Sequence, residues 1–246
     1  MTAASGFVSR SHRAIRPFEL HRSRTEAEAA SHVAAGARVH AGGVDLVEQL
    51  QRGDHIAQVV DVSRVASMKR IEVVDDSLHI GAAVTHDTIE THPLVRTHRP
   101  DVARAWATVG NLRIRRTGTV GGNLMAFDKN YDAAPILAAA GARLVWATPE
   151  GEVVTDVEGR STERLLLRIS VPLEGRVGFD RSLKPAVTVA YGDRIAIGCA
   201  YPDLHVCALD ADLGGLPEPL DDADASGAYR RRMIGVLVER LQRALA

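Results

Sequence analysis

The chain has 246 residues, of which 46% are hydrophobic and 25% charged, as in ordinary globular proteins. Lys and Arg number 30 against 31 Asp and Glu, and the formal net charge of −1 leaves no overall basic field to hold a nucleic acid or an anionic membrane. The two cysteines, Cys199 and Cys207, are too few to hold an iron–sulfur cluster or a structural zinc, and they fit a reducing compartment.

No segment of the sequence is expected to span a membrane. The most apolar stretch, residues 133–147, is interrupted by Arg143 and falls short of the roughly 20 apolar residues that a spanning helix needs. Residues 1–16 are basic and lack the central apolar block of a secretory signal. We expect a flexible tail there, with an organellar presequence as the alternative, and a cytoplasmic protein.

From Pro17 onward the pattern predicts ordered structure. A helix is expected over residues 25–35, where Thr25 and Glu28 have the spacing of a capping box. Strands are expected at 38–41, 59–62, 71–74 and 78–81, with Asp75 and Asp76 turning a hairpin between the last two. Helices are expected at 45–51, from 85 to a break at Pro93, and at 101–109.

The middle of the chain contains its least ordinary segment. Residues 110–124 are too rich in glycine for a regular helix and too basic for a buried strand. A helix is expected next at 132–140, followed by strands at 143–147, 153–154 and 165–171, the last ending at Pro172.

Beyond Pro172 the pattern indicates a separate, smaller C-terminal unit. Residues 186–191 and 194–199 read as a hairpin that turns at Gly192 and Asp193. Residues 210–224 carry six acids and no base, which predicts a solvated loop. An amphipathic helix is expected over 229–245, because Met233, Leu237 and Leu241 recur at helical spacing.

Two glycine pairs are the strongest candidates for binding chemistry. The first, Gly42 and Gly43, joins a predicted strand to a predicted helix, where exposed backbone N–H groups favour an anion such as a diphosphate. An ordinary turn is the alternative for this pair taken alone. The pattern is not the GxGxxG of a dinucleotide-binding turn, so a doubly wound fold is unsupported.

The second pair, Gly121 and Gly122, lies between the hydroxyl of Thr119 and the carboxamide of Asn123, with Asp132 shortly after. These groups suit a long anionic ligand with a polyhydroxyl chain. Asp132 is equally well explained as the N-cap of the following helix. The nearby arginines Arg113, Arg115 and Arg116 are alternatively a solvated basic stripe.

The order of these segments resembles the FAD-binding (medium) subunits of molybdenum hydroxylases, which include the flavoprotein subunits of carbon monoxide and xanthine dehydrogenases. The segments that carry the resemblance are 38–46 (RVHAGGVDL), 114–124 (IRRTGTVGGNL) and Asp132. Weaker likeness extends to residues 17–21, 80–85 and 229–232, so that it covers nearly the whole chain from Pro17.

The resemblance implies an α+β architecture: a PCMH-type FAD-binding fold of two α/β subdomains, followed by a small, shortened C-terminal α/β domain. The expected boundaries are a tail over 1–16, an FAD-binding domain over 17–172 with subdomains of about 17–68 and 69–172, and a C-terminal domain over 173–246.

The resemblance also implies a role for each matching residue. The first loop would wrap the diphosphate of a non-covalently bound FAD, and it consists of Ala41, Gly42, Gly43, Val44, Asp45 and Leu46. Thr119, Gly122 and Asn123 would complete the cofactor loop, and Asp132 would bind ribityl or ribose hydroxyls. Val109 and Gly110 would lie near the ring system, and Leu166 would pack on the isoalloxazine.

The chain departs from the family pattern in four places. Val44 stands where a hydroxyl residue is usual, and residues 127–131 replace a smaller, proline-containing stretch. Residues 155–164 are shorter than the loop that covers one face of the flavin in relatives, and the strand expected after Phe179 is shortened. The residue that replaces a family lysine there is one of three candidates: Asp180, Arg181 or Lys184.

The resemblance implies an FAD-dependent oxidoreductase component. Electrons would pass from a molybdenum-bearing large subunit through [2Fe–2S] clusters on a small subunit to FAD, and then to NAD(P), oxygen or a quinone. No catalytic side chain and no metal ligand is expected in this chain. The alternatives are a free-standing FAD oxidase or dehydrogenase that acts directly on a small molecule, and a scaffold that no longer binds FAD.

The histidines are expected to be bystanders. The ten residues show no metal-ligand spacing, and His79 and His86, which flank a strand and a turn, are expected on the surface.

Overall fold

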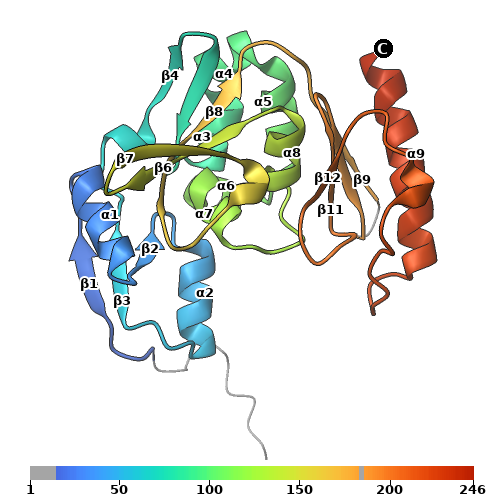
Figure 1. Ribbon diagram of the computed structural model, residues 1–246. Coiled ribbons are helices and arrows are strands. Elements are labelled where there is room, and N and C mark those ends of the chain that lie inside the picture. The colour runs from blue at the N-terminus through green and yellow to red at the C-terminus, as the bar shows by residue number, and fades with distance from the viewer. Residues whose placement is uncertain (1–14, 183–185) are drawn as a thin grey trace, which may run out of the picture.

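The computed structural model describes residues 15–182 and 186–246 (Figure 1). The predicted tail, apart from its last two residues, and Lys184 lie outside the described residues. The described residues form three sheets with helices between and around them, and each sheet is built from one continuous stretch of the sequence.

The N-terminal unit is a three-stranded parallel sheet of order β1-β3-β2 with a helix after each of its first two strands. Its elements are β1 (Glu19–Arg22), α1 (Glu26–Ala34), β2 (Arg38–His40), α2 (Val44–Arg52) and β3 (Gln58–Asp61). The capping box predicted at Thr25 and Glu28 begins α1, with both reciprocal hydrogen bonds present.

The second unit is a five-stranded antiparallel sheet of order β4-β5-β8-β6-β7 packed against a layer of short helices. Its strands are β4 (Ile71–Val74), β5 (Ser77–Gly81), β6 (Arg143–Thr148), β7 (Gly151–Asp156) and β8 (Leu165–Pro172). Its helices are α3 (His86–Thr91), α4 (Pro93–His98), α5 (Pro100–Trp106), α6 (Leu112–Thr117), α7 (Val120–Met125) and α8 (Ala133–Ala139), with 3-10 turns η2 (Ser67–Lys69) and η3 (Val157–Gly159).

The C-terminal unit is a four-stranded antiparallel sheet of order β12-β11-β10-β9 that lies between α8 and the terminal helix (Figure 1). Its elements are β9 (Gly178–Arg181), β10 (Thr188–Tyr191), β11 (Ile195–Gly198), β12 (His205–Cys207), the 3-10 turn η4 (Leu213–Gly215) and α9 (Gly227–Leu245). The predicted hairpin is present, with β10 and β11 paired across Gly192 and Asp193.

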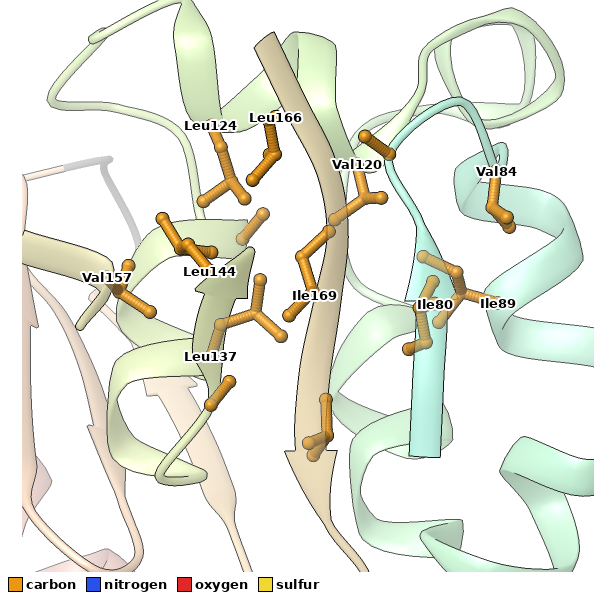
Figure 2. Close-up of a cluster of buried hydrophobic side chains, with 14 of the residues drawn as sticks. Ile80, Val84, Ile89, Val120, Leu124, Leu137, Leu144, Val157, Leu166 and Ile169 are labelled. Atoms are coloured by element: carbon orange, nitrogen blue, oxygen red, sulfur yellow. The ribbon is translucent and has the colours of Figure 1, made fainter. Parts of the chain in front are cut away.

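The main core fills the space between the five-stranded sheet and its helices. Figure 2 shows part of it, where Ile169 of β8 lies between Leu137 and Leu144 on one side and Ile80 on the other. The same cluster includes Ala190 and Ala196 of the C-terminal sheet. Apolar packing is therefore continuous from the second unit into the C-terminal sheet, while Ile234, Leu237 and their neighbours fill a separate cluster under α9.

Two segments differ from the sequence expectation. Residues 110–124 form the two six-residue helices α6 and α7, because Asn111 accepts from the N–H groups of Arg113 and Ile114 and Thr119 accepts from that of Gly122. The glycines at 121 and 122 are thus compatible with a short, well-capped helix.

The acidic segment 210–224 is only partly the predicted solvated loop. Asp222 forms ion pairs with Lys129 at 2.9 Å and with the fully buried Arg230. These contacts, led by the hydrogen bond from Lys129, lower the pKa of Asp222. The segment therefore fastens the C-terminal unit to the loop that precedes α8.

Candidate functional site

One cavity of about 300 Å³ lies between the N-terminal unit and the short helices of the second unit. All thirteen residues predicted from the sequence line it: Ala41, Gly42, Gly43, Val44, Asp45, Leu46, Val109, Gly110, Thr119, Gly122, Asn123, Asp132 and Leu166. These residues come from the turn between β2 and α2, the start of α2, the loop between α5 and α6, the start of α7, the residue before α8, and β8. Their convergence is therefore a property of the tertiary structure.

The first glycine loop leaves the start of α2 without a cap. Its N-cap residue is Gly43, which has a φ of 77° and no side chain to accept a hydrogen bond. The N–H groups of Val44, Asp45 and Leu46 donate to no other group among the described residues. Free amide donors and the positive end of the helix dipole make this end of the cavity suited to an anion.

The two glycine loops touch each other directly at Gly42. A Cβ atom at this position would lie 1.8 Å from the backbone oxygen of Thr117. Gly121 has a similar constraint, since its Cβ would lie 2.7 Å from the backbone oxygen of Ala82. Both glycines are therefore required by the packing of neighbouring backbone segments.

In the second loop the backbone N–H groups of residues 120–122 already donate hydrogen bonds within the protein. The N–H of Val120 donates to Val84 O at 3.0 Å, that of Gly121 to Ala82 O at 2.9 Å, and that of Gly122 to Thr119 Oγ1 at 3.1 Å. What it leaves for a ligand is the side chain of Asn123, whose buried Oδ1 has no partner. An anion at this site would therefore be held mainly by α2.

Asp132 is buried at the start of α8 but does not cap it. Its carboxylate accepts no hydrogen bond from the helix, Oδ2 lies 3.1 Å from Arg181 Nη2, and the buried Oδ1 has no partner. Burial raises the pKa of Asp132 to about 6, although the positive charge of Arg181 acts to lower this pKa. Asp132 therefore occupies the N-cap position of the alternative interpretation, but its side chain makes no capping hydrogen bond. Its unpaired acceptor lies in the cavity lining, as a hydroxyl-bearing ligand requires.

Two arginine side chains near the site already form ion pairs and hydrogen bonds within the protein. Arg115 lies 3.3 Å from Glu90 and donates to Ala107 O, so it is not part of a solvated stripe. Arg113 and Arg116 are exposed, as the alternative interpretation expects. Of the three candidates for the family lysine, Arg181 lines the cavity and also donates to Thr108 O at 2.7 Å. Asp180 instead pairs with Arg240.

Sequence reasoning missed several residues of the lining. Tyr131 donates to Asp45 Oδ1 at 2.6 Å and so connects the loop before α8 to the start of α2. Arg164 lies beside Leu166 in the lining, with its guanidinium 5.8 Å from the Trp146 ring centroid. The departure of residues 127–131 from the family pattern was the one signal that pointed to Tyr131.

His86 corrects an expectation. It was expected on the surface, but it is 1% exposed and lines the cavity, because α3 packs against α5 and α6. His79 is half-buried on β5, and burial followed by the charge of Arg168 lowers its pKa.

The lining suits a long ligand that has an anionic centre and hydroxyl groups. Free amides at α2, unpaired oxygens on Asn123 and Asp132, and apolar surface from Val109 and Leu166 meet in a single cavity. Within residues 15–182 and 186–246 no three His, Cys, Asp or Glu side chains are grouped to hold a metal ion. In the same residues no helix is long and apolar enough to cross a membrane.

Residues 16–173 match a family model described as the FAD binding domain in molybdopterin dehydrogenase. The chain is 33% identical over 112 residues to the nicotinate dehydrogenase FAD-subunit of Eubacterium barkeri, which is 45% of this chain and 38% of that protein. It is 27% identical over 144 residues to caffeine dehydrogenase subunit beta of Pseudomonas sp. strain CBB1, 54% of this chain and 49% of the relative. The alignments therefore span half or less of these two curated relatives.

The fold is similar to that of solved structures. Carbon monoxide dehydrogenase from Hydrogenophaga pseudoflava superposes with a TM-score of 0.85 at 20% identity, over 94% of this chain and 98% of the other. Quinoline 2-oxidoreductase from Pseudomonas putida 86 does so with a TM-score of 0.82 at 22% identity, over 93% and 96% of the two chains. At these identities the match establishes the PCMH-type α+β fold.

Proposed function

Because the chain belongs to the family of FAD-binding domains of molybdopterin dehydrogenases, we propose that it relays electrons from [2Fe–2S] clusters on a partner subunit, through FAD, to an acceptor. Binding of FAD and membership of an oxidoreductase follow from the family. The route and direction of the electrons are our proposal.

The observation that carries the proposal is the set of unpaired polar groups in the cavity. Three amide N–H groups at the start of α2 have no partner among the described residues. Oδ1 of Asn123 and Oδ1 of Asp132 are buried and also lack partners there, although buried polar groups are normally hydrogen-bonded. FAD carries both complements, a diphosphate for the amides and hydroxyls for the oxygens. The residues present therefore fit this cofactor.

Each part of the lining has a proposed task. The segment from Ala41 to Leu46 holds the diphosphate on backbone N–H groups, so Val44 loses one side-chain contact and keeps the main-chain ones. Thr119 shapes the second loop by capping α7, and Gly122 and Asn123 face the cofactor beside it. Asp132 accepts from ribityl or ribose hydroxyls.

Apolar residues hold the ring system in this proposal. Val109, Gly110 and Leu166 line the cavity, and Leu166 is anchored in the core beside Leu124 and Leu144 (Figure 2). When bound, FAD supplies the reversible electron-transfer chemistry, while the protein supplies binding, orientation and electrostatics. No side chain of this chain is assigned as a general acid or base.

We further propose that the chain works with partners. Its relatives are named as subunits of dehydrogenases, and the two cysteines of this chain cannot hold a [2Fe–2S] cluster. The clusters and the molybdenum would therefore reside on a small and a large partner subunit, with NAD(P), oxygen or a quinone as acceptor, in the cytoplasm. The proposed division of the chain is 17–172 for FAD binding and 173–246 for the C-terminal domain.

Flavin content of the purified protein tests the cofactor site. The wild-type protein should be yellow and should release intact FAD on heat denaturation, as a non-covalent complex does. Gly43→Val should abolish retention, because Gly43 has a φ of 77° and a Cβ there would lie 2.9 Å from His40 Nε2. Gly53→Val is the matched control, since Gly53 has a φ of 91° at the other end of α2, with nothing near its Cβ position. Equal loss of FAD in both variants would show a general effect of backbone strain.

Affinity purification of the tagged chain from its native cell tests the partners. Recovery of a [2Fe–2S] protein and a molybdenum protein, with FAD reduced by the substrate of that complex, supports the relay. Turnover of an organic substrate by the isolated yellow chain would instead establish the free-standing oxidase or dehydrogenase. A folded chain that binds no FAD would overturn both.

A further inference from the structure

His86 is a buried polar residue of the cavity wall for which the proposed roles leave no task. It is the first residue of α3, follows the helix-capping Thr85, and is 1% exposed. Its backbone N–H donates to Gly118 O at 3.1 Å, which attaches α3 to the glycine that precedes the second loop. Both His86 and Gly118 line the cavity.

Trp106 determines which ring nitrogen of His86 carries the proton. The indole Nε1–H can only donate, and it lies 3.1 Å from His86 Nδ1. Nδ1 must therefore be the acceptor. Burial, with a smaller contribution from the charge of Arg115, lowers the pKa of His86 to about 4, so the ring is neutral near pH 7. A neutral imidazole whose Nδ1 accepts carries its single proton on Nε2.

Within the described part of the chain, the hydrogen bond from Trp106 is the one that the His86 ring makes, so the Nε2–H group has no acceptor there. The edge of the ring formed by Cδ2 and Nε2 faces Gly118, where a Cβ would lie 3.2 Å from Cδ2 and 3.4 Å from Nε2. The missing side chain at Gly118 keeps that edge uncovered. Nε2 is not one of the fully enclosed side-chain atoms that lack a partner, and His86 lines the cavity. Its N–H group is therefore available to an acceptor of a ligand in the cavity.

We propose that His86 is a cofactor-binding residue, whose Nε2–H donates a hydrogen bond to an acceptor atom of FAD, and that Trp106 is the positioning residue that fixes its tautomer. The inference rests on the proposed function, because it requires FAD in this cavity. It adds a donor from α3, an element to which neither glycine loop belongs.

The tautomer can be observed directly. In protein labelled with ¹⁵N-histidine, long-range ¹H–¹⁵N correlation spectra at pH 7 should show His86 as the Nε2–H tautomer before FAD is added. Addition of FAD should shift the Nε2 and Hε2 resonances of His86, and Nδ1 should move less. Trp106→Phe should convert His86 to a mixture of tautomers, because it removes the N–H that occupies Nδ1.

Binding of FAD, followed by the quenching of flavin fluorescence, tests the contact. His86→Leu should weaken binding about ten-fold, and His86→Gln less, because a carboxamide nitrogen can still donate from near the Nε2 position. Trp106→Phe should weaken binding a few-fold while His86 itself is intact. His205→Gln is the control, since His205 packs against Tyr201 on the C-terminal sheet and should leave the affinity unchanged.

The outcomes separate the two proposals. FAD binding with the same affinity in wild type, His86→Leu and Trp106→Phe, or an unshifted His86 Nε2 resonance, overturns the role of His86 and leaves the FAD site standing. An Nδ1–H tautomer overturns the role of Trp106. Absence of FAD binding by wild-type protein would remove the proposed function and this inference together.

Discussion

Asp132 is a carboxylate that the fold holds in an unfavourable environment until a ligand is present. It is 6% exposed, and within residues 15–182 and 186–246 its Oδ1 has no partner and its one ion pair is with Arg181, whose side chain is 41% exposed. Arg181 therefore compensates only part of the burial, and the pKa of Asp132 stays raised, at about 6. Buried polar groups without a partner are characteristic of binding sites. They lower the stability of the ligand-free protein and contribute to its affinity for the ligand.

Asp132→Asn should make the FAD-free protein more stable at neutral pH. The folded state of the wild type keeps a proton on Asp132 up to about pH 6, whereas the unfolded state loses it near the ordinary value of 3.8. The wild type should therefore lose stability relative to the variant as pH rises from about 4 to 6, by about 3 kcal/mol in all. Urea unfolding of both proteins between pH 4.5 and 7.5 measures the difference, and a difference that does not change with pH would contradict the assignment.

Asp132→Ala should weaken FAD binding by about 1–2 kcal/mol, because it removes the acceptor for a cofactor hydroxyl. Titration followed by flavin fluorescence measures the affinity. Asp180→Ala is the matched control, since Asp180 pairs with Arg240 and does not line the cavity. Equal losses in the two variants would remove the hydroxyl contact from the proposal.

Among the helices that begin at the cavity, α2 and α7 differ in how the N–H groups of their first turns are hydrogen-bonded. α7 is capped by Thr119 and bonded to residues 82 and 84, whereas α2 begins at Gly43 without a cap. α2 is also connected to the loop before α8 through Tyr131 and Asp45. Burial, followed by the hydrogen bond to Asp45, raises the pKa of Tyr131, so its hydroxyl remains a donor at any ordinary pH.

Tyr131→Phe should speed the exchange of FAD. The hydrogen bond of 2.6 Å from Tyr131 to Asp45 joins two parts of the cavity wall, and we expect it to break when FAD enters or leaves. Hydrogen bonds to charged groups contribute about 1.5–3 kcal/mol, so association and release should both accelerate about ten-fold while the affinity changes little. Stopped-flow fluorescence measures both rates. Unchanged rates would show that FAD passes elsewhere, and Tyr191→Phe, on β10, serves as the control.

Substitution by alanine should change the free energy of unfolding in opposite directions at two helical glycines, Gly235 and Gly121. Gly235 lies in the middle of α9 with open space at its Cβ position, so Gly235→Ala should raise the free energy of unfolding by about 0.5–1 kcal/mol. Gly121→Ala should lower it, because the added Cβ would lie 2.7 Å from Ala82 O and 2.9 Å from Ala82 Cβ. Chemical denaturation of both variants measures the two signs, and stabilisation by Gly121→Ala would contradict the packing described for the second loop.

At the scale of the whole molecule, a buried ion pair joins the helices to the segment that leads into the C-terminal unit. Arg99 donates to both carboxylate oxygens of Asp101, at 3.1 and 2.9 Å, and to the backbone oxygens of Pro172 and Glu174. Asp101 in turn accepts from the N–H of Val177 at 2.7 Å. The position of the C-terminal sheet beside α8 thus depends on a polar cluster as well as on the continuous core.

Arg99→Met should lower the free energy of unfolding by about 3–5 kcal/mol, because it leaves Asp101 charged and buried without its partner. Burial alone would raise the pKa of Asp101, but the hydrogen bonds and charge of Arg99 outweigh it and lower the pKa. A lowered pKa means that the ion pair stabilises the wild type above about pH 4 and that this contribution is lost as pH falls further. Urea unfolding from pH 3 to 7 should show that acid-dependent loss in the wild type and not in Arg99→Met. Matching pH profiles would contradict the role of the pair.

The sequence allowed local features to be predicted where local chemistry determines them. The capping box at Thr25, the hairpin at Gly192 and the strand ending at Pro172 depend on residues within a few positions of one another. The helices α6 and α7 were not predicted, because helix propensity disfavours their glycines. The capping hydrogen bonds of Asn111 and Thr119, which propensity does not include, compensate for this. The partners of Asp222 could not be predicted, because Lys129 is distant in the sequence.

The segments that line the cavity can be identified from the amino-acid sequence alone, since two glycine loops and a following aspartate are local patterns. Which polar groups remain available there depends on the folded chain. In the folded chain the amide N–H groups of Val120 and Gly121 in α7 donate to residues just after β5, whereas those at the start of α2 have no partner among the described residues. His86, which was expected on the surface, lies in the cavity wall beside Trp106. The physical reason is that a hydrogen-bond donor is free or used according to what the fold places next to it, and those neighbours come from distant parts of the chain.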